Sequence, residues 1–380
     1  MPFPRFDRTK LRFHSLEQRS NRVSIERDHV SPSAAPGPLQ TEALAAIRAA
    51  ANAAREARRN RRPVVLAFGA HTIKNGLAPV LIEMIETGQL THLATNGAGI
   101  IHDWEFAFQG RSSEDVRANV RKGCFGIWEE TGRYLNLALL IGAYEDLGYG
   151  ESIGSLVQND GLTIPGRDEL IRMAGRAASN PERAAAAADL LWAVQTYDLS
   201  PGFLRIEHPY KRFGLQAAAF RLKVPFTAHP MFGHDIIYTH PLNRGAAVGR
   251  TAERDFLTFA AAIAELEGGV YISLGSAVMS PMIFEKSLSM ARNLAIQEKR
   301  ILEHYSIFVV DLAASDWDWR KRGEPPPEDP AYYVRYMKTF SRMGGTLHYL
   351  QADNRDFLLA LKRELGPAKG TVDKKAESGS

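Results

Sequence analysis

Val64-Val65-Leu66-Ala67-Phe68 and Leu90-Thr91-His92-Leu93-Ala94 are two apolar runs, and each ends in a turn of small and polar residues. The turns are Gly69-Ala70-His71-Thr72 and Thr95-Asn96-Gly97-Ala98-Gly99. Between the runs, apolar residues recur at helical spacing, which predicts strand, helix and strand. A parallel sheet built this way binds its ligands beyond the carboxyl ends of its strands, where glycines let backbone N–H groups approach a phosphate or sugar. Both turns are therefore expected to line a site.

The same rhythm returns in the second half of the chain. Strands are predicted at residues 223–226, 236–238, 270–274, 307–310 and 346–350, with helices at 253–265 and 281–304. Two more polar strand ends follow from this, Gly275-Ser276-Ala277 and Asp311. The predicted fold is α/β and Rossmann-like, a mostly parallel sheet flanked by helices.

The chain is predicted to have three parts. Residues 1–38 form an N-terminal arm, because Ser31 to Pro38 cannot build a regular element, and such an arm often packs on a neighbour in an oligomer. Residues 39–366 form the α/β domain, with a mostly helical excursion at 112–199 that is either a layer of that domain or a cap over the site. Residues 367–380 are polar and expected to be disordered.

Composition narrows the class of protein. The chain has 380 residues, a net charge of +4 and 45% hydrophobic residues, without a run long enough to span a membrane or an h-region of a secretory signal. The single Cys124 excludes an intrachain disulfide, so a soluble cytoplasmic protein without a membrane partner is expected. The arginines at 58–62 close a predicted helix and lack interleaved aromatic residues, which argues against nucleic-acid binding.

Several histidines lie in or beside the predicted strand-end loops. His229, His234 with its neighbour Asp235, and His102 with its neighbour Asp103 are candidate proton carriers, because histidine titrates near neutral pH. Zinc or iron would use the same side chains, but no dense ligand spacing such as His-Glu-x-x-His is present, so no metal is expected. The glycines of Asn96 to Gly99 do not complete a Gly-x-Gly-x-x-Gly fingerprint, since position 102 is histidine.

Lys338 lies among aromatic and apolar residues in Tyr332-Tyr333-Val334-Arg335-Tyr336-Met337-Lys338. Such surroundings can desolvate an ammonium group, lower its pKa and free the amine to attack a carbonyl or imine carbon. Lysines in such places also extend along apolar surface with the charge in water, and the local sequence leaves both interpretations open.

Taken in order, these features resemble the deoxyhypusine synthase family, which includes bacterial members similar to homospermidine synthases. The resemblance extends over most of the chain after residue 60. It is carried by Phe68 to Thr72, Thr95 to Asp103, Gly233 to His240, Ile272 to Ser276, and the interval of eight residues from Pro330 to Lys338.

The resemblance implies an NAD-binding Rossmann-like fold, assembled as a homotetramer with sites near subunit interfaces. It implies that NAD oxidises a polyamine and that a lysine, here Lys338, carries the aminobutyl group to an acceptor amine. The sequence departs from the family at His102, where an acidic residue is expected, and at Pro230, where an aspartate is expected, so the substrate pocket differs.

The sequence thus predicts an NAD-dependent transferase or oxidoreductase acting on an amine. The catalytic candidates are Lys338, His229, His234, Asp235 and His102. The expected cofactor-binding residues are Gly69, Ala70, His71, Thr72, Asn96, Gly97, Ala98, Gly99, Asp103, Gly275, Ser276 and Asp311. A metal-assisted lyase or hydrolase and a non-catalytic oligomeric protein that keeps the fold are the alternatives.

Overall fold

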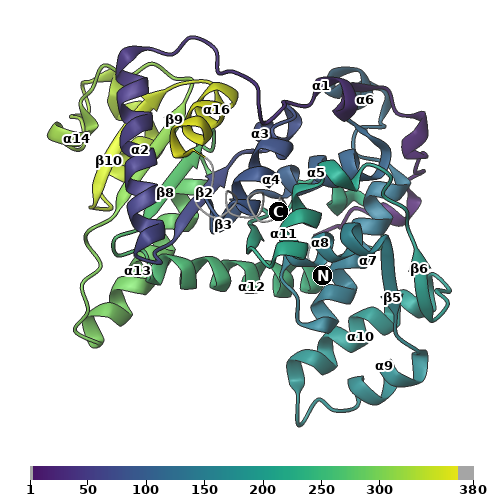
Figure 1. The fold of residues 1–380 in the computed structure, drawn as a ribbon. Helices are drawn as coiled ribbons and strands as arrows, with labels where there is room; N and C mark the ends of the chain where they lie inside the picture. The colour runs from purple at the N-terminus through teal and green to yellow at the C-terminus, as the bar shows by residue number, and fades with distance from the viewer. Residues whose placement is uncertain (1–2, 367–380) are drawn as a thin grey trace, which may run out of the picture. The chain divides into compact units, whose positions relative to one another are not determined.

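The computed structural model describes residues 3–366 and divides them into two compact units (Figure 1). The first unit takes the chain up to His29, then Asn96–Arg221 and Phe226–Leu257. The second takes Val30–Thr95, Leu222–Pro225 and the chain from Thr258. The structure therefore divides the chain differently from the predicted single domain with a helical excursion, because that excursion forms a unit with segments before and after it.

The predicted parallel sheet is present. Its strand order is β10-β9-β8-β2-β3-β7. The strands are β2 (Val64–Phe68), β3 (His92–Thr95), β7 (Phe226–Ala228), β8 (Val270–Leu274), β9 (Ser306–Asp311) and β10 (Thr346–Gln351). From β10 to β3, every neighbouring pair is parallel and in continuous register. The predicted α/β class is thus confirmed.

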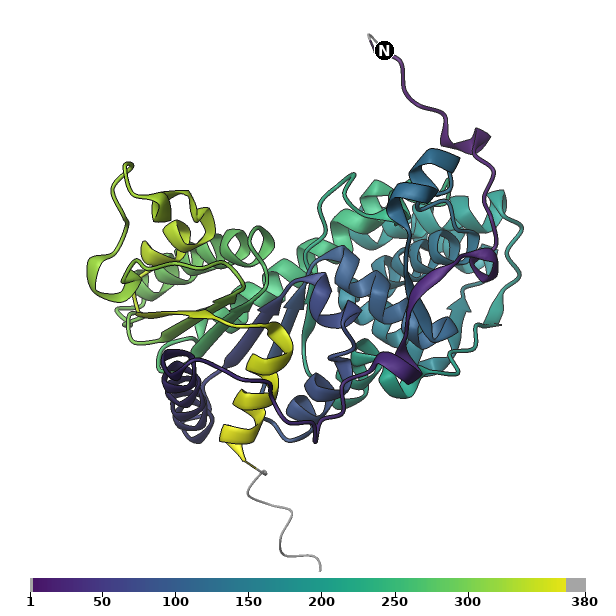
Figure 2. The ribbon, with the colours of Figure 1, turned by 90° about the horizontal axis from the view of Figure 1, so that it is seen from above.

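Apolar residues cover both faces of this sheet in the second unit, which explains why its strands are continuous apolar runs. On one face, alternate strand residues such as Val65, Tyr271 and Ile307 join a core with Phe284 and Phe340. These last two lie on α13 (Met279–Gln297) and α15 (Arg335–Ser341). Helices α2 (Thr41–Arg59) and α16 (Asn354–Leu365) lie on the other side of the sheet (Figure 2).

The remaining elements of the second unit are short helices that follow strands or connect them. They are α3 (Ala70–Lys74), α4 (Ala78–Glu86), α14 (Trp319–Arg322) and the 3-10 helix η5 (Pro330–Tyr333). Helix α12 (Gly245–Ala264) contains the boundary between the units at Leu257.

The first unit is mainly helical, as predicted for residues 112–199, with two small antiparallel strand pairs, β1 with β4 and β5 with β6. Its helices are α1 (Ile25–Asp28), α5 (Gly97–Gln109), α6 (Val116–Lys122), α7 (Glu129–Glu145), α8 (Tyr149–Asn159), α9 (Arg167–Ala174), α10 (Pro181–Thr196) and α11 (Leu215–Leu222). Its paired strands are β1 (Asn21–Ser24), β4 (Arg111–Glu114), β5 (Gly161–Ile164) and β6 (Gly202–Arg205), and its 3-10 helices are η1 (Arg8–Lys10), η2 (Leu16–Gln18), η3 (Lys211–Phe213) and η4 (Ile236–Thr239).

Three expectations about local structure need correction. Residues 236–238 form η4 rather than a strand, because their backbone bonds are local, from Tyr238 N to Asp235 O and from His240 N to Ile237 O. The strand expected at 223–226 begins only at Phe226. Much of the expected N-terminal arm is integral to the first unit, since Leu16 and Ile25 are fully buried. The tail expected at 367–380 lies outside the described residues.

Candidate active site

Three polar strand ends of the second unit form a row at one edge of the sheet. Phe68 pairs with Leu274, and Leu274 pairs with Val310, so the residues that follow, Gly69 and Gly275, are neighbours and Asp311 is next in the row. Backbone bonds extend the ladder one step beyond the strands, from Gly69 N to Leu274 O and from Gly275 N to Val310 O. The structure thus brings together three of the four predicted polar strand ends.

Packing within the chain accounts for both glycines. A Cβ on Gly69 would lie 2.2 Å from the carbonyl oxygen of Gly275, so no side chain fits between these strand ends. Gly275 has a φ of +54° and is covered by the side chain of Asn354, which would be 2.8 Å from a Cβ. The two glycines therefore let these strand ends and Asn354 pack closely against one another.

The other predicted cofactor residues of this unit differ in exposure. Thr72 is fully buried and its hydroxyl accepts a hydrogen bond from Asn354 Nδ2 at 3.2 Å. The hydroxyl of Ser276 accepts from the backbone N–H of Ser280 in the next helix. His71 is exposed, and Ala70 is half-buried. Asp311 is half-buried, and its carboxylate accepts from Ala313 N at 3.0 Å.

Lys338 does not have the lowered pKa that one of the two interpretations of its aromatic surroundings requires. Its Nζ lies 3.5 Å from the centroid of the Tyr332 ring and 3.2 Å from a carboxylate oxygen of Glu324. Contact with Tyr332 and the ion pair with Glu324 raise the pKa of Lys338, outweighing partial burial. A protonated lysine cannot attack a carbonyl carbon, so the structure gives no support to Lys338 as a covalent relay.

The start of α5 in the first unit holds the other predicted glycine turn. Asn96 caps this helix, its side chain accepting from Gly99 N at 3.0 Å, while Ala98 is half-buried. Gly97 lies against the carboxylate of Asp235, and a Cβ on Gly97 would be only 2.1 Å from Asp235 Oδ2. The glycine is therefore required by a carboxylate of the chain itself.

Asp235 is a buried carboxylate without the partners that buried carboxylates normally have. The residue is 9% exposed, and its Oδ2 has no hydrogen-bond partner within residues 3–366. Burial raises the pKa of Asp235 to about 7. The hydroxyls of Tyr149 and Tyr238 are also buried without a partner in this part of the chain. After burial, the charge of Asp235 is the next cause raising the pKa of each tyrosine.

A second buried carboxylate, Asp255 of α12, supports this cluster. Its Oδ2 accepts from the backbone N–H groups of Ala228, at the end of β7, and Gly150, in the first turn of α8, at 2.6 and 2.9 Å. It thereby fixes the strand end before His229 and the helix turn that carries Tyr149. Burial raises the pKa of Asp255 to about 7, against its hydrogen bonds.

The two histidines predicted in this region differ. His229 is buried, and its Nε2 lies 3.0 Å from the Thr227 hydroxyl. His234 is exposed in the loop before Asp235. Of the predicted proton carriers after β7, Asp235 rather than His234 thus has the environment of a functional group.

Asp103 is wrongly predicted as a cofactor ligand. It is fully buried, and its carboxylate accepts from the backbone N–H groups of Leu215 and Gln216 and from the Gln216 side chain, at 2.9 to 3.0 Å. Burial raises its pKa to about 6 against these bonds. The carboxylate holds the start of α11, and its full burial keeps it from contact with a ribose.

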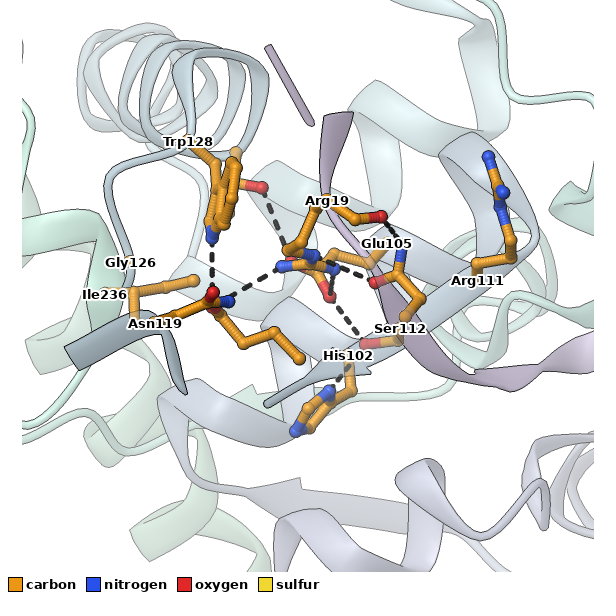
Figure 3. Close-up of polar contacts among 12 residues, drawn as sticks. Arg19, His102, Glu105, Arg111, Ser112, Asn119, Gly126, Trp128 and Ile236 are labelled. Carbon is orange, nitrogen blue, oxygen red and sulfur yellow. Dashed lines mark hydrogen bonds and ion pairs between the residues drawn. The ribbon is translucent and has the colours of Figure 1, made fainter. Parts of the chain in front are cut away.

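His102 belongs to a buried polar network (Figure 3). Its Nδ1 lies 2.7 Å from the Ser112 hydroxyl, which donates to Glu105 Oε2 at 2.5 Å. Arg19 binds both oxygens of Glu105, at 2.7 and 2.6 Å. A second carboxylate, Glu114, lies 3.8 Å from Arg19 and accepts from Trp128 Nε1 and Asn119 Nδ2. The sequence offered no local signal for this network, because Arg19 and Glu105 are 86 residues apart.

The described residues also bear on a metal site and on a membrane-spanning helix. Within residues 3–366, no three His, Cys, Asp or Glu side chains are grouped so that they could hold a metal ion. Over the same residues, no helix combines the length and apolar character that crossing a membrane requires.

Comparison with known proteins gives likeness of fold only. No protein-family model matches the chain, and no curated protein matches it significantly. A conserved LOR/SDH protein from Methanococcus maripaludis S2 matches with a TM-score of 0.43 and 13% identity, over 88% of this chain and 73% of that one.

AgrE, solved with ornithine and NAD+, matches with a TM-score of 0.42 and 14% identity, over 86% of this chain and 34% of AgrE. ArgZ, an arginine dihydrolase from cyanobacteria, matches with a TM-score of 0.37 and 12% identity, over 84% of this chain and 32% of ArgZ. This chain therefore spans about a third of AgrE and ArgZ. None of these three proteins is a deoxyhypusine synthase, so that resemblance stays a prediction from the sequence. At such identities and scores, the proposals below rest on the residues of this chain.

Proposed function

We propose that this protein is an NAD-dependent enzyme acting on a substrate that carries an amine. The observation that carries the proposal is the buried Oδ2 of Asp235, which has no partner within the described chain, beside the equally unpartnered hydroxyls of Tyr149 and Tyr238. Buried polar groups are nearly always hydrogen-bonded, and those that are not commonly mark a place where a ligand binds.

An ammonium group fits the missing partner best. An ionised carboxylate only accepts hydrogen bonds, and a buried carboxylate needs a positive charge nearby to stay ionised. A phosphate or carboxylate ligand would instead be repelled by Asp235. The two tyrosine hydroxyls can accept further N–H groups of the same ammonium, because each hydroxyl has free lone pairs.

The strand ends of the second unit fit a dinucleotide. Gly69 and Gly275 leave backbone without side chains at two neighbouring strand ends, and Asp311 at the third supplies an acceptor for ribose hydroxyls. These residues would hold NAD, with His71 exposed beside them. When bound, NAD would accept a hydride from the carbon that bears the amine.

The chain's own groups would bind the amine and move protons. Asp235, with its pKa near 7, can lose its proton to receive an ammonium and can regain a proton at neutral pH. His102 and His229 are the further proton carriers we propose. The finer assignment, an aminoalkyl transferase of the deoxyhypusine or homospermidine synthase type working as a homotetramer, rests on the sequence resemblance alone.

Binding measurements on the full chain test the proposal. We expect calorimetry to detect spermidine or a simpler diamine, and Asp235→Asn to weaken that binding by about 10- to 100-fold, as expected for a lost charged hydrogen bond. Asp235→Asn should leave NAD binding unchanged, whereas Asp311→Asn should weaken NAD and not the amine.

His234→Gln is the matched control, because His234 is the exposed neighbour of Asp235. Amine affinity that is equal in the wild type, Asp235→Asn and His234→Gln would refute the amine site. Absence of NAD binding would refute the cofactor while leaving the amine site standing.

A further inference from the structure

The geometry of the polar network around His102 determines which of its atoms donate hydrogen bonds and which accept them. The network is a chain of contacts from Arg19 through Glu105 and Ser112 to His102 (Figure 3). Both Arg19 and Glu105 are 2% exposed in their side chains, and Ser112 is fully buried, so water does not supply alternative partners.

Glu105 is held as a carboxylate in this chain. Burial opposes its ionisation, but the charge and the paired hydrogen bonds of Arg19, together with the charge of His102 and the Ser112 hydrogen bond, outweigh burial and hold the pKa of Glu105 below its usual value. An ionised carboxylate has no proton to donate. At 2.5 Å from Glu105 Oε2, the Ser112 hydroxyl must therefore be the donor in that bond.

A serine hydroxyl has one proton, and here that proton is engaged with Glu105. In its 2.7 Å contact with His102, the Ser112 oxygen can only accept, so His102 Nδ1 must carry a proton. The tautomer of a neutral imidazole is set in this way by the hydrogen bond that one of its nitrogens makes.

We infer that Arg19, Glu105 and Ser112 form a positioning relay that fixes His102 in the Nδ1–H tautomer, so that Nε2 is the nitrogen that gains and loses a proton. The relay positions His102 and does not itself touch a substrate. That His102 serves as a proton carrier in catalysis rests on the proposed function, but the tautomer does not.

The N-terminal segment contributes to this positioning relay in two ways. Arg19 lies just before β1, and in that strand Val23 pairs directly with Ser112 of β4. Thr131 also donates to Glu105, at 3.4 Å. The same short segment thus supplies the guanidinium group that binds Glu105 and the strand whose backbone pairs with that of Ser112.

Nuclear magnetic resonance of the full chain labelled with ¹⁵N-histidine tests the inference without any substrate. His102→Gln identifies the His102 signals by their loss. We expect the neutral ring to show its proton on Nδ1 and a proton-free Nε2. Ser112→Ala should weaken or abolish that Nδ1–H signature. Thr131→Val should keep the signature, because this variant removes a donor to Glu105 but leaves the contact between Ser112 and His102 in place.

Three results would overturn the inference. The first is a neutral His102 with its proton on Nε2, and the second is an Nδ1–H signature unaffected by Ser112→Ala. The third is a ring that stays doubly protonated from about pH 5 to 9, because such a ring would not gain and lose a proton near neutral pH. If Ser112→Ala does not fold, the wild-type tautomer still decides. Once turnover is measured, Ser112→Ala should shift the pH profile of kcat while Thr131→Val does not, and failure of the proposed function would leave the tautomer result intact.

Discussion

Asp235 is expected to cost the folded protein stability, and the cost should grow with pH. Its pKa rises from 3.8 to about 7 on burial. One pKa step is worth about 1.4 kcal/mol, so folding with the ionised carboxylate costs about 4 kcal/mol relative to folding with the neutral acid. Asparagine has nearly the same shape and no charge. We therefore expect Asp235→Asn to raise the free energy of unfolding.

The pH window follows from the same two pKa values. Below pH 3.8, Asp235 is protonated in both the folded and the unfolded chain, so it does not affect the pH dependence. Between pH 3.8 and about 7, the folded chain holds a proton that the unfolded chain has lost, so stability falls as pH rises. Above about 7 the full cost is present. The advantage of Asp235→Asn should thus be small near pH 4 and reach about 4 kcal/mol above pH 8.

Urea unfolding at pH 5 and pH 8, followed by tryptophan fluorescence and circular dichroism, measures this difference. Asp103→Asn is the matched control, because Asp103 is also buried with a raised pKa but accepts three hydrogen bonds that an amide cannot all accept. It should destabilise the protein at both pH values. The reasoning would be refuted if Asp235→Asn were neutral at pH 8, or if its advantage were larger at pH 5.

Three further outcomes are expected. Gly97→Ala should cost about 1–3 kcal/mol by overpacking against Asp235, and most of that loss should disappear in an Asp235→Ala background; urea unfolding of both single variants and the double variant measures the coupling. Arg19→Met should cost about 3–5 kcal/mol because Glu105 loses its buried counter-charge, and Arg19→Met with Glu105→Leu should recover part of it in the same assay; equal stability of the single and double variants would contradict this. Amine binding should weaken by roughly tenfold for each pH step below 7, as Asp235 must lose its proton first; calorimetry at three pH values checks the slope, which Asp235→Asn should flatten.

Periodic sequence patterns predicted the sheet well. The runs at Val64–Phe68 and Val270–Leu274 are fully buried strands, as their unbroken apolar character indicated. Such runs are decided by local composition, and the parallel pairing then follows from the intervening helices. The turns after them also lie in one row, which needed only the rule that parallel strands end at the same edge.

The same patterns did not predict the short helix η4 or the contacts between residues distant in sequence. The short run Ile236 to Tyr238 has strand-like composition, but η4 forms because its backbone groups find partners within the turn. Lys338 has the neighbours of a desolvated amine, yet Glu324, fourteen positions away, keeps it charged. Arg19 belongs to the segment predicted to be an arm, and nothing near it in the sequence indicates its partner, Glu105.

Three buried carboxylates at or near α5 show how a site can be told from structure of the same composition. Asp103 and Glu105 lie on the helix, and each has several donors, so each carboxylate fixes a neighbouring part of the first unit. Asp235 immediately precedes η4, and its carboxylate lies against Gly97 at the start of the same helix, with Oδ2 unpartnered within residues 3–366. Folding alone would favour an asparagine or an apolar residue there, because an unpartnered buried charge costs stability. Our proposal explains this carboxylate, whose Oδ2 has no partner within residues 3–366, by a ligand that completes it, and an ammonium is the ligand whose charge would lower the pKa of Asp235 again.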